Sequence, residues 1–271
     1  MKTSDILTPI GLLLGIGCIF WGISTGDTGL NGFIDIPSVI ITIGGSFAAI
    51  LVTFSLDDIK SLIKMTKHLF ISPKMSKVDL IQDFKTLSIK SRKDGLLSIE
   101  DNLEQIEDNF MRSGLELVID GIESDVIVEI LNGNIAEIEN RYKRGAKIYK
   151  TWGSFAPAFG MLGTLIGLIQ MLATLDNPDM IAIGMAKALI TTFYGSLLAN
   201  LAFNPMGFNL QYKGEKEADN REMILVGIIS IKDGDTTRIL EEKLKSFLTE
   251  KEKKEYDNES NERKRAGISA A

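Results

Sequence analysis

The chain has 271 residues, of which 45% are hydrophobic and 24% charged, with a formal net charge of −6 and a mean hydropathy of +0.11. The charged residues are separated from the apolar ones. No Lys or Arg lies between Lys2 and Lys60, and Lys187 is the only one in residues 151–212. A soluble domain mixes both classes in every segment, and a disordered chain has few apolar residues. The pattern excludes both and indicates a polytopic membrane protein.

Charge and side-chain chemistry exclude several functions. Acidic residues accompany the basic ones in both polar blocks, so neither block is a nucleic-acid site. The single cysteine, Cys18, allows no internal disulfide and no cysteine cluster for a metal. The single histidine, His68, lies in the basic segment KMTKHLF and is expected to be solvated. There is no phosphate loop and no nucleophile–base pair, so we expect neither an enzyme nor a bound cofactor.

Four apolar stretches are long enough to cross a bilayer, which takes about 20 residues. They are residues 6–24, 33–54, 151–175 and 181–208. The first is expected to be a retained helix rather than a signal peptide, because a second span follows within ten residues. The alternative, apolar helices of a large buried core, is disfavoured because the loops within each pair of spans are very short.

The flanks of these spans predict their orientation. The loops TGDTGLNG and DNPDM contain Asp but no Lys or Arg. The segments that flank the other ends of the spans are rich in Lys and also contain Arg. The positive-inside rule then places both termini and the block between the pairs in the cytoplasm. We expect four segments: the first two spans (1–54), a cytoplasmic helical domain (55–150), the third and fourth spans (151–208), and a cytoplasmic C-terminal helix with a charged tail (209–271).

The cytoplasmic block is predicted to be helical. Leu80, Phe84 and Leu87 recur at helical spacing, Ser76 and Gly95 punctuate the pattern, and Gly121 marks a stop. No alternating run resembles a strand. The apolar stretch 223–231 is expected to pack against this block, and the charged residues 249–271 are expected to be disordered. The predicted fold class is all-α, a membrane protein with four transmembrane helices.

A proton channel needs an ionisable group near the middle of the bilayer. The acidic residues of the spans lie near the span ends instead: Asp5, Asp27, Asp35, Asp176 and Asp179. Lys187 lies about two turns into the fourth span and is expected to snorkel outward. A carboxylate in the ion path would therefore have to come from a partner helix.

The later spans contain small and hydroxyl residues at helical spacing. Pro157 and Thr164 are seven residues apart and share one face of the third span. In the fourth span, one face is predicted to contain Ala188, Thr192, Ser196 and Ala199. Two interpretations remain open: close helix packing, or a pore-facing surface that supplies oxygen ligands without charge.

The segments SFAPAFGMLGTLIGLIQML and GMAKALITTFYGSLLANLAFNPMGF resemble the last two spans of the MotA/PomA family of flagellar motor stator proteins. The resemblance covers the whole chain, through IGLLLGIGCIFWGI, DIPSVIITIGGSFAAILV, the insert motif SRKDGLLSIED and the charged tail. The distantly related TolQ/ExbB proteins share the proline-containing third-span motif but have three spans.

The resemblance implies a homopentamer in the bacterial inner membrane. Five such subunits surround two copies of a MotB-type single-span subunit, which supplies the essential aspartate. Ion passage turns the ring, and the cytoplasmic domain pushes on the rotor through its switch protein FliG. The transported ion is a proton or sodium, and this alternative stays open.

The resemblance also implies roles for single residues. Pro157 and Pro205 match the prolines that couple ion flow to motion. Arg92 and Glu100 match the charged pair that faces the rotor, and Lys93 is an adjacent candidate. Exposed charges on a solvated helix often contribute nothing measurable, which is the alternative for these three.

The candidates for the ion pathway are Pro157 and three hydroxyl residues. Thr164 and Thr192 match the hydroxyls near the ion site, especially in sodium-driven members, and Ser196 shares the face of Thr192. Because hydroxyls also serve a proton path through ordered water, they do not identify the ion.

Overall fold

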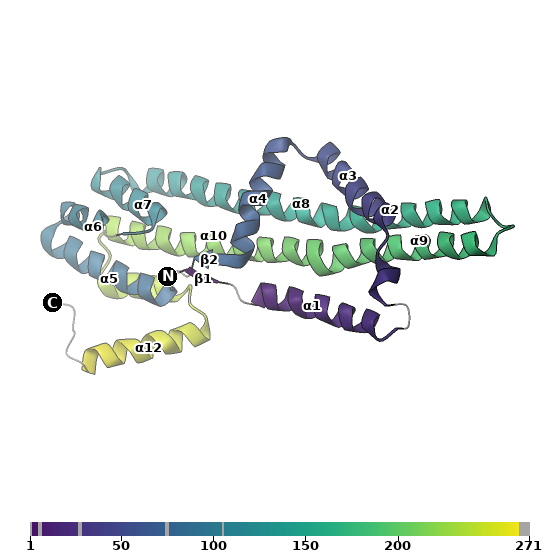
Figure 1. The fold of residues 1–271 in the computed structure, drawn as a ribbon. Helices are drawn as coiled ribbons and strands as arrows, with labels where there is room; N and C mark the ends of the chain where they lie inside the picture. The colour runs from purple at the N-terminus through teal and green to yellow at the C-terminus, as the bar shows by residue number, and fades with distance from the viewer. Residues whose placement is uncertain (1, 5–6, 27–28, 74–75, 105, 266–271) are drawn as a thin grey trace. The chain divides into compact units, whose positions relative to one another are not determined.

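The structure is a computed structural model that describes residues 2–4, 7–26, 29–73, 76–104 and 106–265. It is almost entirely helical (Figure 1), which confirms the predicted all-α class. The chain divides into two compact units. Residues 1–73 and 141–213 form the first, here called the span unit, and residues 74–140 and 214–271 form the second, called the insert unit.

Among the described residues, the span unit contains the first two candidate membrane spans and parts of the last two. Its elements are β1 (Lys2–Ser4), α1 (Leu7–Ser24), the 3₁₀ turn η1 (Leu30–Phe33), α2 (Ile36–Val39), the π-helix η2 (Ile40–Gly44), α3 (Gly45–Thr53), α4 (Leu56–Phe70), β2 (Ile71–Pro73), the second part of α8 (Ser124–Leu172), α9 (Pro178–Leu197), the π-helix η4 (Leu198–Phe203) and the first part of α10 (Asn204–Lys232).

Four helical stretches are long and apolar enough to cross a membrane, which confirms the four predicted spans. They are Leu7–Ser24, Ile36–Thr53, Ser124–Leu172 and Pro178–Lys232. The last two are long because α8 begins well before its apolar part and α10 continues well beyond that of the fourth span. Figure 1 shows α9 running alongside the end of α8.

Local sequence signals explain how the spans begin. The Asp35 carboxylate accepts a hydrogen bond from the Ser38 N–H at 2.9 Å and caps α2. The Asn177 side chain likewise accepts from the Asp179 N–H at 3.1 Å at the start of α9. A proline follows each cap within the first turn, where its missing N–H costs no hydrogen bond.

One short strand pair accompanies the helices. β1 and β2 form an antiparallel pair in which Lys2 lies opposite Pro73 and Ser4 opposite Ile71. Segments of three residues are too short to show the alternation that indicates a strand in a sequence. The pair therefore does not change the all-α class.

The insert unit is a helical domain with its own core. Its elements are α5 (Lys77–Asp94), the 3₁₀ turn η3 (Leu96–Ile99), α6 (Glu100–Leu103), α7 (Asn109–Ile119), the first part of α8, the second part of α10, α11 (Thr237–Lys245) and α12 (Glu250–Arg265). Ser76 caps α5, as expected. Gly95 and Gly121 end helices at φ of 88° and 77°, a backbone region that favours glycine.

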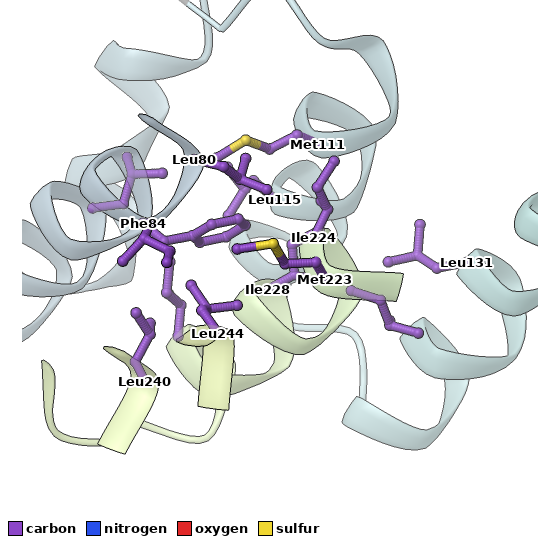
Figure 2. Close-up of a cluster of buried hydrophobic side chains, with 14 of the residues drawn as sticks. Leu80, Phe84, Met111, Leu115, Leu131, Met223, Ile224, Ile228, Leu240 and Leu244 are labelled. Atoms are coloured by element: carbon purple, nitrogen blue, oxygen red, sulfur yellow. The ribbon is translucent and has the colours of Figure 1, made fainter. Parts of the chain in front are cut away.

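The core of the insert unit joins segments that are far apart in the sequence. In Figure 2, Phe84 of α5 lies among side chains of α7, α10 and α11. Phe84, Leu115 and Ile228 are completely buried. The apolar stretch 223–231 therefore packs against the block between the span pairs, as predicted.

The predicted disorder of the charged tail is wrong for residues 250–265. These form α12, and its Tyr256 is only 1% exposed. The Lys85 ammonium donates to the Tyr256 hydroxyl at 3.2 Å, and the Lys245 ammonium lies 4.7 Å from the ring centroid. The composition predicted disorder because it counts charges and gives no weight to one buried aromatic anchor.

Some expectations concern residues outside the described part of the chain. Asp5, Asp27 and the tail residues 266–271 are among them, as is the side chain of His68. The four predicted segments follow expected membrane boundaries, whereas the two compact units follow packing. The four-segment division accordingly stays a prediction.

Candidate ion pathway and rotor surface

The α8–α9 contact is built from small residues that let the two backbones approach closely. A Cβ at Gly160 would lie 3.0 Å from the Thr191 carbonyl oxygen, and one at Gly167 would lie 2.8 Å from that of Gly184. Ala188 is 4% exposed and Thr191 1% exposed on the same side of α9. Small residues at such contacts are typical of helices that associate in lipid.

Thr164 and Thr192, predicted from their spacing and from the family resemblance, come together across this contact. Their Oγ1 atoms lie 2.5 Å apart. The Thr164 hydroxyl also lies 3.1 Å from the Gly160 carbonyl oxygen and 3.0 Å from that of Ala188. Each hydroxyl has one proton, so these contacts are alternatives between which the proton can exchange. Thr164 is half-buried and Thr192 is exposed.

Ser196 lies one turn after Thr192 and is also exposed. The sequence pattern did not single out Asn200, which continues the same row. Its side-chain amide donates to the Ser196 carbonyl oxygen at 3.0 Å and approaches the Ser196 hydroxyl at 3.4 Å. We call Thr164, Thr192, Ser196 and Asn200 the hydroxyl–amide row. The available signal for Asn200 was its spacing of four residues from Ser196 and eight from Thr192.

The predicted four-residue face of the fourth span needs a correction. Ala188 and Ala199 are buried, whereas Thr192 and Ser196 are exposed, so the four do not share one environment. The true packing face is Gly184, Ala188, Thr191 and Gly195, all of which are buried. The buried side of α9 fits the helix-packing interpretation. The pore-facing interpretation of the exposed hydroxyl side stays a prediction.

The two candidate coupling prolines lie at different kinds of site. Pro157 is inside α8, where its ring removes a backbone donor, and a Cβ at Gly195 would lie 3.0 Å from the Pro157 Cα. Pro205 is exposed and is the second residue of α10, directly after the π-helix η4. π-segments and prolines are both recognised causes of local bending, so each site is a candidate hinge.

Polar contacts that the sequence did not indicate tie the second span to α8 and α9. The buried Thr42 hydroxyl, in the π-helix η2, donates to the Thr191 carbonyl oxygen at 3.4 Å. The Tyr194 hydroxyl donates to the Phe33 carbonyl oxygen and accepts from the Asp35 N–H at 3.3 Å. No sequence period could reveal these pairs, because each joins residues that are about 150 positions apart.

Aromatic packing adds a second tie near the other end of the spans. The Trp152 indole N–H donates to the Ser46 hydroxyl at 3.0 Å. Its ring stacks on Phe203 of the π-helix η4 with centroids 4.3 Å apart. The half-buried Lys187 forms no ion pair with the described residues of the chain. In the same part of the chain, no group of three or more His, Cys, Asp or Glu could hold a metal.

The candidate rotor residues lie in the insert unit around a sharp break. Arg92 and Lys93 occupy the last turn of α5, and Glu100 begins α6 after the 3₁₀ turn η3. All three are exposed. Arg92 and Glu100 do not lie on one continuous helix, because Gly95 ends α5 at a φ of 88°. They flank a turn instead, which we call the Gly95 turn (residues 92–100).

The four candidate spans define a polytopic membrane protein. The row of neutral oxygen and amide groups on the last two spans makes it suited to be a subunit of an ion channel. The chain belongs to the MotA/TolQ/ExbB proton channel family, whose sequence profile matches residues 102–223. This confirms the family resemblance, which rested on motifs along the whole sequence.

Several relatives match over nearly the whole chain. Motility protein A of Borreliella burgdorferi is 41% identical over 94% of this chain and 98% of its own. Chemotaxis protein PomA of Vibrio alginolyticus is 33% identical over 91% and 96%. A solved structure of MotAB from C. jejuni matches with a TM-score of 0.85 at 27% identity, covering 91% of this chain and 96% of that one. The flagellar MotAB stator complex of Bacillus subtilis matches equally well, with a TM-score of 0.85.

Proposed function

We propose that this protein is the A subunit of a flagellar motor stator. Together with a MotB-type single-span subunit, it forms a cation channel in the bacterial inner membrane and converts ion flow into torque on the flagellar rotor. The relatives are named motility and chemotaxis proteins, and the solved structures are described as MotAB complexes. The observation that carries the proposal is the hydroxyl–amide row of α8, α9 and η4, which offers oxygen atoms without a carboxylate.

The ion pathway runs along Thr164, Thr192 and Ser196, and the partner helix supplies the essential aspartate beside them. We propose a proton as the transported ion, with sodium as the alternative, and no bound cofactor. Calcium, a cation of similar size to sodium, keeps its oxygen ligands at about 2.3–2.6 Å. The neighbouring Thr164 and Thr192 hydroxyls can supply such ligands to sodium, and they equally suit a chain of hydrogen bonds that carries a proton.

Coupling to motion involves Pro157 and Pro205. Gly195 packs directly against the backbone at Pro157, and Pro205 follows a π-helix, so a change beside the hydroxyl–amide row can alter the course of either helix. Torque then passes to the rotor switch protein FliG through Arg92, Lys93 and Glu100.

The assembly is a pentamer of this chain around two B subunits, with both termini in the cytoplasm. α1 supports a lipid-facing position, since none of its residues is buried and its large apolar side chains are exposed. The subunit works without catalysing a chemical reaction and without binding nucleic acid. A TolQ/ExbB-like role in energising the cell envelope is disfavoured by the four spans and by the relatives named for motility.

Complementation of a swimming defect tests the proposal. Deleting the gene in its own host should leave cells with assembled flagella that do not turn, and restoring the gene should recover swimming. The Thr192→Val variant, which keeps the shape but removes the hydroxyl, should be present in the membrane without restoring swimming. Normal swimming in the deletion strain, together with a defect in the outer envelope, would favour the TolQ/ExbB-like role.

A further inference from the structure

Leu97 is an exposed apolar side chain at the Gly95 turn. It is 69% exposed, the highest value among the large apolar residues that the structure describes in the insert unit. The others above one third are Val126 and Ile130 at 42% and Ile239 at 47%. Its neighbours in η3 point inward instead: Ile99 is fully buried and Leu96 packs against the core. The same short turn thus buries two apolar residues and displays the third.

The turn that displays Leu97 is held firmly. Gly95 adopts a φ of 88°, and the Ser98 hydroxyl lies 2.6 Å from the Gly95 carbonyl oxygen. The Lys90 ammonium donates to the Asn102 side chain at 2.6 Å and so joins α5 to α6 across the turn. Leu97 is therefore exposed by a defined backbone and not by fraying of a helix end, so it enters an interface with little further loss of entropy.

The charges around Leu97 lack partners within the described part of the chain. Arg92, Lys93 and Glu100 are exposed and form no ion pair there. Elsewhere in the same unit charges do pair: Lys85 with Glu241 at 3.0 Å, and Arg221 with Asp108 at 2.5 Å. Favourable positions at helix ends explain the signs of these charges, which are basic in the last turn of α5 and acidic in the first turn of α6. They do not explain an apolar side chain between them.

We propose that Leu97 is the apolar centre of the rotor-binding surface and that Arg92, Lys93 and Glu100 form its charged rim. The partner surface is a helix face of the rotor protein with an apolar depression, bordered by an acidic group toward α5 and a basic group toward α6. An apolar centre within a polar rim is the usual anatomy of a protein interface. This inference rests on the proposed function, and it adds a specificity-determining residue that is uncharged.

The two parts of this surface contribute differently to binding. Rim charges mainly raise the rate of encounter and fix the register, and salt screens them. A buried leucine mainly slows dissociation, and salt does not weaken it. The contribution of Leu97 should therefore persist in a salt concentration at which that of Arg92 and Glu100 is lost.

The test uses the complete A–B complex in lipid nanodiscs and the purified rotor switch protein. Dissociation constants are measured at low salt and at 0.5 M salt. At the higher concentration the Debye length falls to roughly one third of its low-salt value, so exposed charges are screened. We expect Leu97→Ala to weaken binding about tenfold at both salt concentrations, and Leu97→Met to bind within about twofold of wild type. Ile239→Ala, which truncates an exposed apolar residue on α11, is the matched control and should bind normally.

Swimming cells provide the second measurement. Leu97→Asp should reduce the torque at high load by more than half, at unchanged membrane level and unchanged ion flux. Dissociation constants and torque equal to wild type in Leu97→Ala and Leu97→Asp would overturn the inference alone, provided that wild type binds the rotor. A wild-type complex that neither binds the rotor protein nor restores swimming would overturn the proposed function as well.

Discussion

The α8–α9 contact in the span unit and the core of the insert unit are packed in opposite ways. At the first, glycines bring two backbones together, and a Cβ added at Gly195 would lie 2.6 Å from the Ala156 carbonyl oxygen. In the second, large side chains fill the space, and Phe84, Leu115 and Ile228 are completely buried. The helices in the span unit expose most of their large apolar residues, whereas those in the insert unit bury theirs.

This difference follows from the solvent around each unit. In water, removing apolar area from solvent is the main driving force, so large side chains gather in a core. In lipid this force is absent between helices, and they associate through close packing and hydrogen bonds. Close backbones also bring the Thr164 and Thr192 hydroxyls within hydrogen-bonding distance. The packing that stabilises the span unit therefore also builds the proposed ion path.

Truncation of the insert core should have the largest effect on stability. Phe84→Ala removes a fully buried ring that packs against Gly227, and should cost about 3–5 kcal/mol. Chemical unfolding followed by proteolysis within the insert unit measures this cost. Ile239→Ala, at a site that is 47% exposed, should change stability by less than about 0.5 kcal/mol. Equal losses of stability in Phe84→Ala and Ile239→Ala would contradict the claim that large buried side chains stabilise the insert unit.

The span unit should be destabilised by enlarging a small residue at the α8–α9 contact rather than by truncating a large one. Gly195→Val forces side-chain atoms against the backbone at Ala156 and Pro157, which cannot move aside as a flexible side chain would. We expect a loss of about 1–3 kcal/mol or more, seen as a lower thermal midpoint in detergent. Gly22→Ala, where an added Cβ meets nothing within 4 Å, is the control and should leave the midpoint unchanged.

The stability of the insert unit should depend on pH through the ionisation of Glu241. Burial opposes ionisation, but hydrogen bonds from Lys245 and Lys85 outweigh it and lower the Glu241 pKa from 4.5 to about 2. A lowered pKa means that the carboxylate stabilises the fold fully above about pH 5 and loses that effect as the pH falls toward 2. The contribution should be about 1–2 kcal/mol after allowance for partial solvent exposure.

The Glu241→Gln variant should therefore be less stable than wild type at pH 7, and the difference should shrink between pH 5 and pH 3. Far-ultraviolet circular dichroism during urea unfolding at each pH measures it. Glu242→Gln changes a neighbouring side chain that is 70% exposed and should behave as wild type. A difference between Glu241→Gln and wild type that stays constant down to pH 3 would contradict the role of this ion pair.

The smallest stability effect and the clearest functional one should come from the threonine pair. Thr164→Ala and Thr192→Ala each remove one hydroxyl at a partly solvated site and should cost about 1 kcal/mol or less. Both should nevertheless slow swimming strongly at normal membrane levels. Thr53→Ala removes an exposed hydroxyl that bonds only to Ala49 of its own helix, and should swim normally. Wild-type speed in both threonine variants would leave helix packing as their only role.

Hydropathy and helix signals were sufficient to predict the four spans and the helix breaks at Gly95 and Gly121. Thr164 and Thr192 were each identified as candidates from the sequence, but their contact across α8 and α9 was not predicted. The break at Gly95 has a further consequence that spacing alone did not give. Since α5 ends there, Arg92 and Glu100 lie on two different helices, on either side of the Gly95 turn.

Other features were beyond prediction because they depend on contacts between distant segments. Thr191, bonded by Thr42, looks like any other hydroxyl residue in a span, and its burial follows from the position of the second span. Tyr256 lies in a sequence that is otherwise charged, and its burial requires α5 and α11 to be in place. A single sequence contains the residues of such pairs but no period that connects them.

The central claim is that this chain supplies the walls of an ion path and a partner supplies its titratable group. Ion flux into vesicles tests it most directly, with this chain alone, with the MotB-type subunit, and with that subunit after its membrane aspartate is replaced by asparagine. The account predicts flux only with the intact partner, and a large reduction of that flux by Thr192→Val in this chain. Substantial flux through this chain by itself would contradict the claim.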